Sequence, residues 1–154
     1  MAKQNEVVKE VTITRLINAP RQRVWKAWTD AKLVSQWWGP RGFSIPVCEV
    51  EPKVGGRILI HMSGFGMLAP MAGVFKEVVE PERLVFTNEA YFDASMSKAL
   101  IEAITTVTFA DEGGKTRLTV HNAVLKAAPE ATQALQGMNQ GWTEQIDKLE
   151  EFLK

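Results

Sequence analysis

Tryptophan is concentrated in one short stretch of this sequence, between Arg15 and Pro40. The stretch holds four of the five tryptophans of the 154-residue chain: Trp25, Trp28, Trp37 and Trp38. Such large aromatic rings require extensive burial, and the two short helices predicted for this stretch have no interior that could provide it. The chain must therefore supply a large apolar surface elsewhere, and the alternating pattern of its middle part predicts a sheet for that purpose.

The first elements of the chain are marked by residues that start and stop helices. Alternation over Val7–Ile17 predicts a strand, and Pro20 suits the first turn of a helix because that turn leaves its N–H unused anyway. Thr29-Asp30 is typical of an N-terminal cap. It predicts a second short helix that contains Trp37 and Trp38 and ends at Gly39-Pro40.

The remaining pattern changes from period two to a helical period. Strands are predicted at 43–51, 57–62, 73–79, 83–88, about 100–109, and 115–124. Asp111 to Gly114 is a strong hairpin signal, and short connections favour antiparallel pairing. After Pro129, apolar residues recur at intervals of three and four, which predicts one long amphipathic helix lying on the sheet.

Composition excludes several classes of function. Lys plus Arg and Asp plus Glu both number 18, so the formal net charge of zero argues against a nucleic-acid-binding protein. No run of about 18 apolar residues predicts a membrane span, and the first ten residues contain no apolar secretion segment. Cys48 is the only cysteine, which excludes an internal disulfide and makes a structural zinc site with His61 and His121 improbable. We expect a cytoplasmic protein without a metal or other cofactor.

Short sequence blocks in this order resemble a known family. They are Ala19-Pro20, residues 24–29 (VWKAWT), 36–40 (QWWGP), 54–57 (VGGR), 82–87 (ERLVFT), 106–109 (TVTF), 116–119 (TRLT) and Gly141-Trp142. Together they resemble the stand-alone homologues of the activator of the ninety-kilodalton heat-shock protein's ATPase, in the START-like (SRPBCC) superfamily. The resemblance covers nearly the whole chain.

The resemblance implies an α+β helix-grip fold in a single domain over residues 1–154. In that fold a curved antiparallel sheet of six or seven strands wraps around a long C-terminal helix, and two short helices follow the first strand. A hydrophobic cavity lies between the sheet and the helix. The family motifs imply no catalytic set, so no catalytic residue is predicted.

Two predicted loops carry apolar side chains that need a place away from water. Residues 58–75 contain no Asp, Glu, Lys or Arg, so we expect the connection Ser63–Ala72 to form either a lid over the cavity or a homodimer contact. Glu89–Ala99 would meet it across the cavity mouth, or would simply fill a gap. In the last helix, Gly137 and Gly141 either allow close approach to the sheet, the favoured interpretation, or leave room for a ligand.

The candidate ligand-binding residues are expected at the mouth or between the sheet and the helix. They are Trp38, His61, Met71, Phe75, Phe86, Tyr91, Met138 and Trp142. Tyr91 pairs an aromatic body with a polar tip. If its strand phase faces the cavity, His61 is the best candidate for a polar contact or a general acid or base. A solvated or structural role is the alternative for this histidine.

The leading hypothesis is therefore binding of a small hydrophobic, aromatic or lipidic molecule, with no chemistry assigned. Two alternatives stay open. The first is a co-regulator of the chaperone ATPase, which the family resemblance implies. The second is a polyketide cyclase or hydrolase-like enzyme that uses the same cavity, with His61 as its base.

Overall fold

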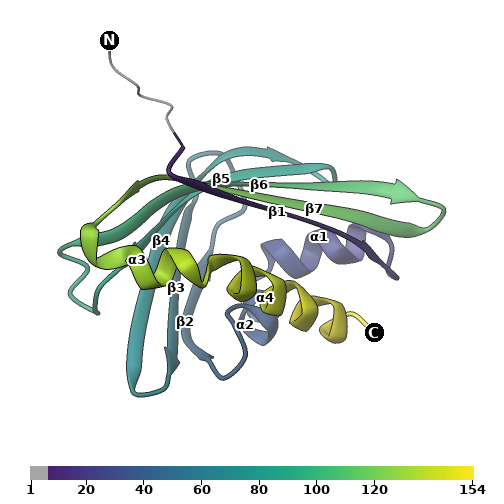
Figure 1. The fold of residues 1–154 in the computed structure, drawn as a ribbon. Coiled ribbons are helices and arrows are strands. Elements are labelled where there is room, and N and C mark those ends of the chain that lie inside the picture. The colour runs from purple at the N-terminus through teal and green to yellow at the C-terminus, as the bar shows by residue number, and fades with distance from the viewer. Residues whose placement is uncertain (1–6) are drawn as a thin grey trace, which may run out of the picture.

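A computed structural model describes residues 7–154, which form a curved seven-stranded antiparallel sheet with helices on its concave side (Figure 1). Residues 1–6, the first part of the segment predicted to lack a secretion signal, lie outside the described residues. The strand order is β1-β7-β6-β5-β4-β3-β2, so the first and last strands are neighbours. The strands are β1 (Lys9–Ile17), β2 (Ser44–Val50), β3 (Arg57–Gly64), β4 (Met67–Val79), β5 (Arg83–Tyr91), β6 (Ala99–Glu112) and β7 (Lys115–Ala127). The α+β helix-grip prediction is confirmed.

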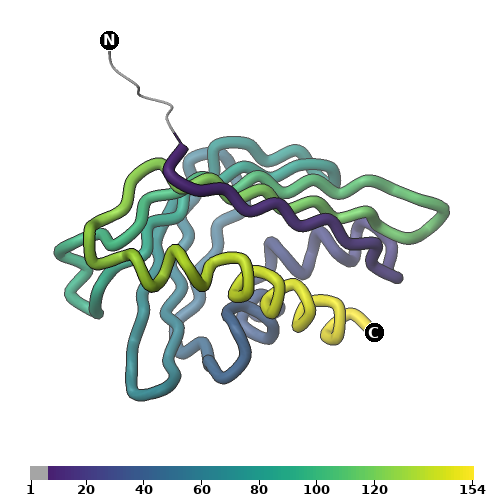
Figure 2. The backbone as a smooth tube through the Cα atoms, in the orientation of Figure 1, coloured from purple at the N-terminus to yellow at the C-terminus, as the bar shows by residue number. Residues whose placement is uncertain are grey.

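The helices lie on one side of this sheet. They are α1 (Arg21–Thr29), α2 (Ala31–Trp37), a 3₁₀ turn (Pro129–Ala131), α3 (Thr132–Gln136) and α4 (Met138–Phe152). Figure 2 shows α4 running across the concave side, with its C-terminal half beside α2. Ile146 and Leu149 of α4 are fully buried there. The amphipathic period predicted for this segment therefore lays its apolar face on the sheet.

The tryptophan cluster fills the space between α1, α2 and the sheet. Trp37 has no exposed surface, and its indole Nε1 donates a hydrogen bond to the Ala27 carbonyl at 2.9 Å. Trp28 packs edge-on against Trp37, with ring centroids 4.7 Å apart, and Phe109 of β6 contacts Trp28 and Trp25. Edge-to-face pairs of this kind add to the stabilisation from buried area. The cluster therefore fixes both helices to the sheet.

The cap predicted for α2 is confirmed, but the helix ends earlier than predicted. The Asp30 carboxylate accepts a hydrogen bond from the Lys32 N–H at 2.9 Å. Trp38 lies just beyond the helix, with an extended backbone, because Gly39 follows it at a positive φ of 88°. The indoles of Trp37 and Trp38 both lie in the core, and that of Trp38 also contacts Trp142 of α4.

The prediction of a long loop over Ser63–Ala72 is wrong. β3 and β4 instead form a tight hairpin whose two turn residues, Phe65 and Gly66, both have positive φ, 53° and 74°. Gly66 tolerates that conformation at no steric cost, and two such residues in succession match the twist of the flanking strands. The alternating pattern of the sequence does not reveal the first part of β4, because Ala69, Pro70 and Ala72 give little contrast between apolar and polar positions.

Two other predicted boundaries also change. β5 continues to Tyr91, so the predicted connection Glu89–Ala99 shrinks to residues 92–98. The single long helix predicted after Pro129 is divided, because Gly137 interrupts it between α3 and α4. Glycine lacks a side chain to hold the helical backbone and costs about 1 kcal/mol in a helix interior relative to alanine.

We predict that Trp37→Ala lowers the free energy of unfolding by about 3–5 kcal/mol, because it removes a fully buried ring and orphans the Ala27 carbonyl. Urea denaturation followed by circular dichroism measures the loss. The control is Phe65→Ala, which removes a ring that is 77% exposed and should change stability by less than about 0.5 kcal/mol. Equal losses in the two variants would contradict a central role of the tryptophan cluster.

Candidate functional site

A cavity of about 430 Å³ lies between the sheet and the start of α4, and it is partly open to solvent. On the helix side it is bordered by α3, α4 and the connection between α2 and β2. Its floor comes from β3, β4, β5, β6 and β7. The wall is mostly apolar, as small-molecule sites usually are, and the volume falls within the range of roughly 300–1,000 Å³ typical of ligand pockets.

Small residues keep this space open. The helix side contributes Ala134, Gly137 and Gly141 to the wall, and the sheet contributes Ala90 and Ala103. A methyl group added at Gly141 would meet only Pro40, at 3.7 Å, which is an ordinary van der Waals distance. Close approach of the backbone therefore does not require glycine at this position. Of the two interpretations of the helix glycines, room beside the helix fits this geometry better.

Four of the eight predicted ligand-binding residues border the cavity together. They are Trp38, Met71, Met138 and Trp142. The indoles of Trp38 and Trp142 pack edge-on with centroids 5.9 Å apart, so they close the end of the cavity that faces the tryptophan cluster. The two methionines lie on opposite sides of the cavity, one on β4 and one at the start of α4. Their flexible thioethers can adapt to ligands of different shapes.

Phe75 and Phe86 lie deeper in the protein, outside this cavity. They contact each other with ring centroids 5.9 Å apart, are 2% and 3% exposed, and belong to the packed core. They border a separate space of only about 10 Å³, which is close to the minimum for a single water molecule. The structure therefore places these two rings as packing beneath the cavity.

His61 lies on the face of β3 opposite the cavity. Met62 borders the cavity and Ile60 borders the core beside it, and successive side chains of a strand point to opposite faces. The condition for a role of His61 in the cavity, that its strand phase faces inward, is therefore not met. Its Nε2 is buried, with no hydrogen-bond partner among residues 7–154.

Tyr91 is at the end of β5 and does not border the cavity. Its hydroxyl donates a hydrogen bond to the Glu89 Oε1 at 3.2 Å. Burial of the phenol, together with the nearby Glu89 carboxylate, raises the pKa of Tyr91 above its ordinary value. The phenol is therefore protonated at neutral pH and engaged with its own strand.

Sequence analysis missed four polar residues at the cavity: Asn88, Thr105, Asn122 and Gln145. Asn88, Asn122 and Gln145 border it, and Thr105 joins the two asparagines from the sheet between them. The signal was present, because Asn122 shares a strand phase with Leu118 and Val120, both buried. A polar residue in a core phase is more informative than another apolar one.

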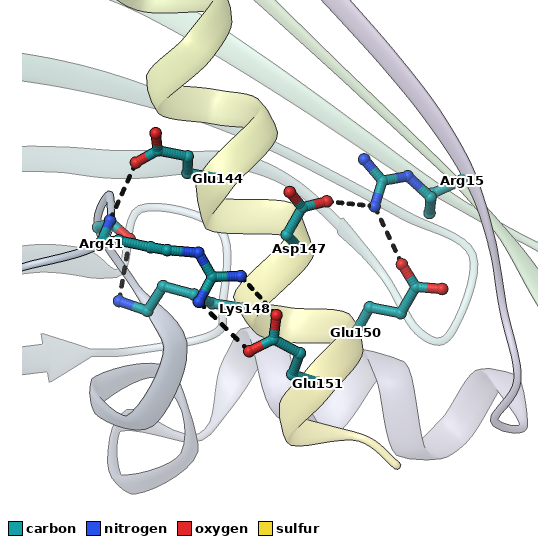
Figure 3. A network of polar contacts seen from close by, with 8 residues as sticks. Arg15, Arg41, Glu144, Asp147, Lys148, Glu150 and Glu151 are labelled. Carbon is teal, nitrogen blue, oxygen red and sulfur yellow. Dashed lines mark hydrogen bonds and ion pairs between the residues drawn. The ribbon is translucent and has the colours of Figure 1, made fainter.

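Ion pairs and hydrogen bonds hold α4 in place on both sides (Figure 3). On the β1 side, Arg15 donates to Asp147 at 2.7 Å and to Glu150 at 3.0 Å, and the bond to Asp147 raises the pKa of Arg15 above its ordinary value. On the other side, Arg41 pairs with Glu151. These contacts fix the helix at its C-terminal half, away from the cavity.

Lys148 ties the same part of α4 to the backbone that follows α2. Its Nζ donates to the Trp38 carbonyl at 3.3 Å and to the Gly39 carbonyl at 3.1 Å. Partial burial lowers the pKa of Lys148. Because Trp38 is also part of the cavity wall, this contact sets the distance between that wall and the helix.

The site offers no arrangement typical of a metal centre. Among residues 7–154, no group of three or more His, Cys, Asp or Glu side chains is placed to hold a metal ion. No helix in the same range is long and apolar enough to cross a membrane. Burial raises the pKa of the Cys48 thiol to about 11, so this thiol is protonated at neutral pH.

Comparison with known proteins identifies the family. The sequence profile described as "Activator of Hsp90 ATPase homolog 1-like protein" matches residues 18–154. The chain belongs to this family. A search of curated proteins finds no match. Family and fold together make the chain a START-like (SRPBCC-type) protein, in agreement with the sequence resemblance.

Solved structures support the fold. A crystal structure from Nitrosomonas europaea is 25% identical, with a TM-score of 0.76, and the match covers 94% of this chain and 93% of the other. A Mycobacterium smegmatis protein is 25% identical, with a TM-score of 0.79 and coverages of 94% and 90%. An Arthrobacter aurescens protein, 24% identical, has a TM-score of 0.83 over 98% and 92% of the two chains, which shows the fold alone.

We predict that Gly141→Ala stabilises the protein by up to about 1 kcal/mol, because alanine favours the helix and its methyl group fits beside Pro40. Urea denaturation measures the change. The matched control is Gly73→Ala on β4, where the added carbon would lie 1.8 Å from the Thr87 carbonyl oxygen. This variant must lower the free energy of unfolding. A destabilised Gly141→Ala variant would mean that α4 does need glycine for close approach.

Proposed function

We propose that the protein binds a small hydrophobic molecule in the cavity between the sheet and α4. The observation that carries the proposal is the mostly apolar space of about 430 Å³ at this position. Its size suits a ligand of one to three fused or linked rings, and burial of apolar surface would supply the binding free energy. The proposed contact residues are Trp38, Met71, Met138 and Trp142.

Filling the cavity provides the test. We predict that wild-type protein binds the neutral fluorophore N-phenyl-1-naphthylamine saturably, and that Ala103→Leu on the cavity floor weakens binding at least about tenfold, because the larger side chain occupies the ligand's space. Fluorescence titration gives the dissociation constants. Ala110→Leu, an exposed position on the same strand β6, is the matched control and should bind like wild type. Absence of saturable binding by the wild type would count against the proposal.

A second candidate, regulation of the Hsp90 ATPase, is favoured by the description of the family that the chain matches. We predict that an activator of this kind would bind the host chaperone in a pull-down and raise its rate of ATP hydrolysis in proportion to the amount added. Bovine serum albumin at equal concentration controls for crowding. Unchanged ATP turnover at a saturating excess of the protein would remove this candidate.

The remaining hypotheses from the sequence have less support. A cyclase or hydrolase with His61 as base would need that ring at the cavity, and it lies on the other face of β3. At the β3–β4 hairpin, Phe65 and Met67 are exposed. We infer that they form a homodimer contact, since exposed apolar surface often marks interfaces. A cytoplasmic location stays a prediction from the sequence.

A further inference from the structure

Three polar side chains form a continuous hydrogen-bonded track across the floor of the cavity. Thr105 of β6 donates from its hydroxyl to the Asn88 Oδ1 of β5 at 2.8 Å, and the Asn122 Nδ2 of β7 donates to the same hydroxyl at 2.8 Å. β5, β6 and β7 are neighbours in the sheet. Thr105 and Asn122 are 0% and 2% exposed. Burial of polar groups is costly unless they are hydrogen-bonded, so any polar group that the track leaves without a partner needs an explanation beyond packing.

The hydrogen bonds of the track leave the NH₂ group of one asparagine and the carbonyl group of the other free. The Thr105 hydroxyl has one hydrogen, so it donates to one asparagine and accepts from the other. One amide therefore keeps its NH₂ group and the other keeps its carbonyl, whichever way the track is directed. No hydrogen bond from another described residue reaches those two remaining groups, and Asn88 and Asn122 both border the cavity.

A third amide comes from the helix side. The Gln145 Oε1 accepts the Gly39 N–H at 2.9 Å, and since that N–H can only donate, the orientation of the side-chain amide is fixed. Its Nε2 is left buried, with no partner among residues 7–154, in a side chain that is 5% exposed and borders the cavity. The cavity is thus bordered by amides on two sides.

Charge further restricts the ligand. Every side chain that the described residues contribute to the cavity wall is uncharged. Moving an ionised carboxylate, phosphate or ammonium group from water into such surroundings is very costly without a paired charge. A neutral group that both donates and accepts meets no such penalty. A hydroxyl group does both, and so it matches the free donor and acceptor of the track.

We propose that the cavity selects an uncharged, mainly aromatic molecule that carries a hydroxyl group, a phenol or an alcohol, with the hydroxyl held by the Asn88–Thr105–Asn122 track. This assignment rests on the proposed function, since it names the class of ligand for the same cavity. The apolar body of the ligand lies against Trp142 and Met138. The track provides selectivity, because a ligand without a polar group would leave its amide groups unpaired.

The test uses three naphthalenes that share a ring system and differ in one substituent. They are 2-naphthol, 2-methylnaphthalene and 2-naphthoate, each displacing N-phenyl-1-naphthylamine from the wild-type protein at neutral pH. We expect 2-naphthol to bind about tenfold more tightly than either of the others, since a hydrogen bond is gained over the methyl compound and a buried charge is avoided over the acid. Asn122→Leu should lower the affinity for 2-naphthol to that of 2-methylnaphthalene.

Amide proton spectra keep the test valid if Asn122→Leu does not fold. In wild-type protein labelled with nitrogen-15, 2-naphthol should shift the side-chain NH₂ signals of Asn88 or Asn122 more than 2-methylnaphthalene does. Equal affinities for these two compounds, or binding of 2-naphthoate as tight as that of 2-naphthol, would overturn the assignment and leave the proposed function intact. Failure of the fluorophore and all three naphthalenes to bind would overturn the proposed function itself.

Discussion

The structure depends on holding α4 against the concave sheet at one end only. Ile146, Leu149 and Leu153 are buried in the core next to the tryptophan cluster, and ion pairs of Arg15 and Arg41 brace the same part of the helix. A helix anchored this way does not have to pack closely along its whole length. Its first turns can then stand away from the sheet, and the cavity lies in the space that remains.

The same division separates the residues that stabilise the fold from those proposed to select a ligand. At the anchored end, large rings and aliphatic side chains interlock, and a cavity there would cost stability in proportion to its volume. At the open end, glycines and alanines set the size of the space, while amides supply direction. Gln145 lies between the anchored end and the open end, because its oxygen fixes the backbone at Gly39 while its side chain borders the cavity. Positioning of the wall and the proposed recognition of a ligand therefore share this residue.

Sequence patterns predicted the elements better than their ends. The order of strands and helices, the cap at Asp30 and the burial of the tryptophans followed from local periodicity and turn chemistry. The structure differs from the prediction where periodicity is weak: the alanine-rich start of β4 is a strand and not a loop, and Gly137 divides the last helix. At the cavity, the aromatic residues and methionines are more conspicuous in the sequence than the asparagines, because apolar content is the stronger signal of a core.

By itself, the sequence determined the order of the strands and helices, since amphipathic periods, caps and turn residues act over a few neighbouring positions, and the helix-grip architecture followed from the family resemblance. Only the tertiary structure decided which strand phase faces the cavity. That choice excluded His61 from the wall and joined Asn88 to Asn122 through Thr105, although 34 positions along the sequence separate the two asparagines. The physical reason is register: pairing of distant strands brings these side chains together, and shifting it by one residue would turn each to the opposite face.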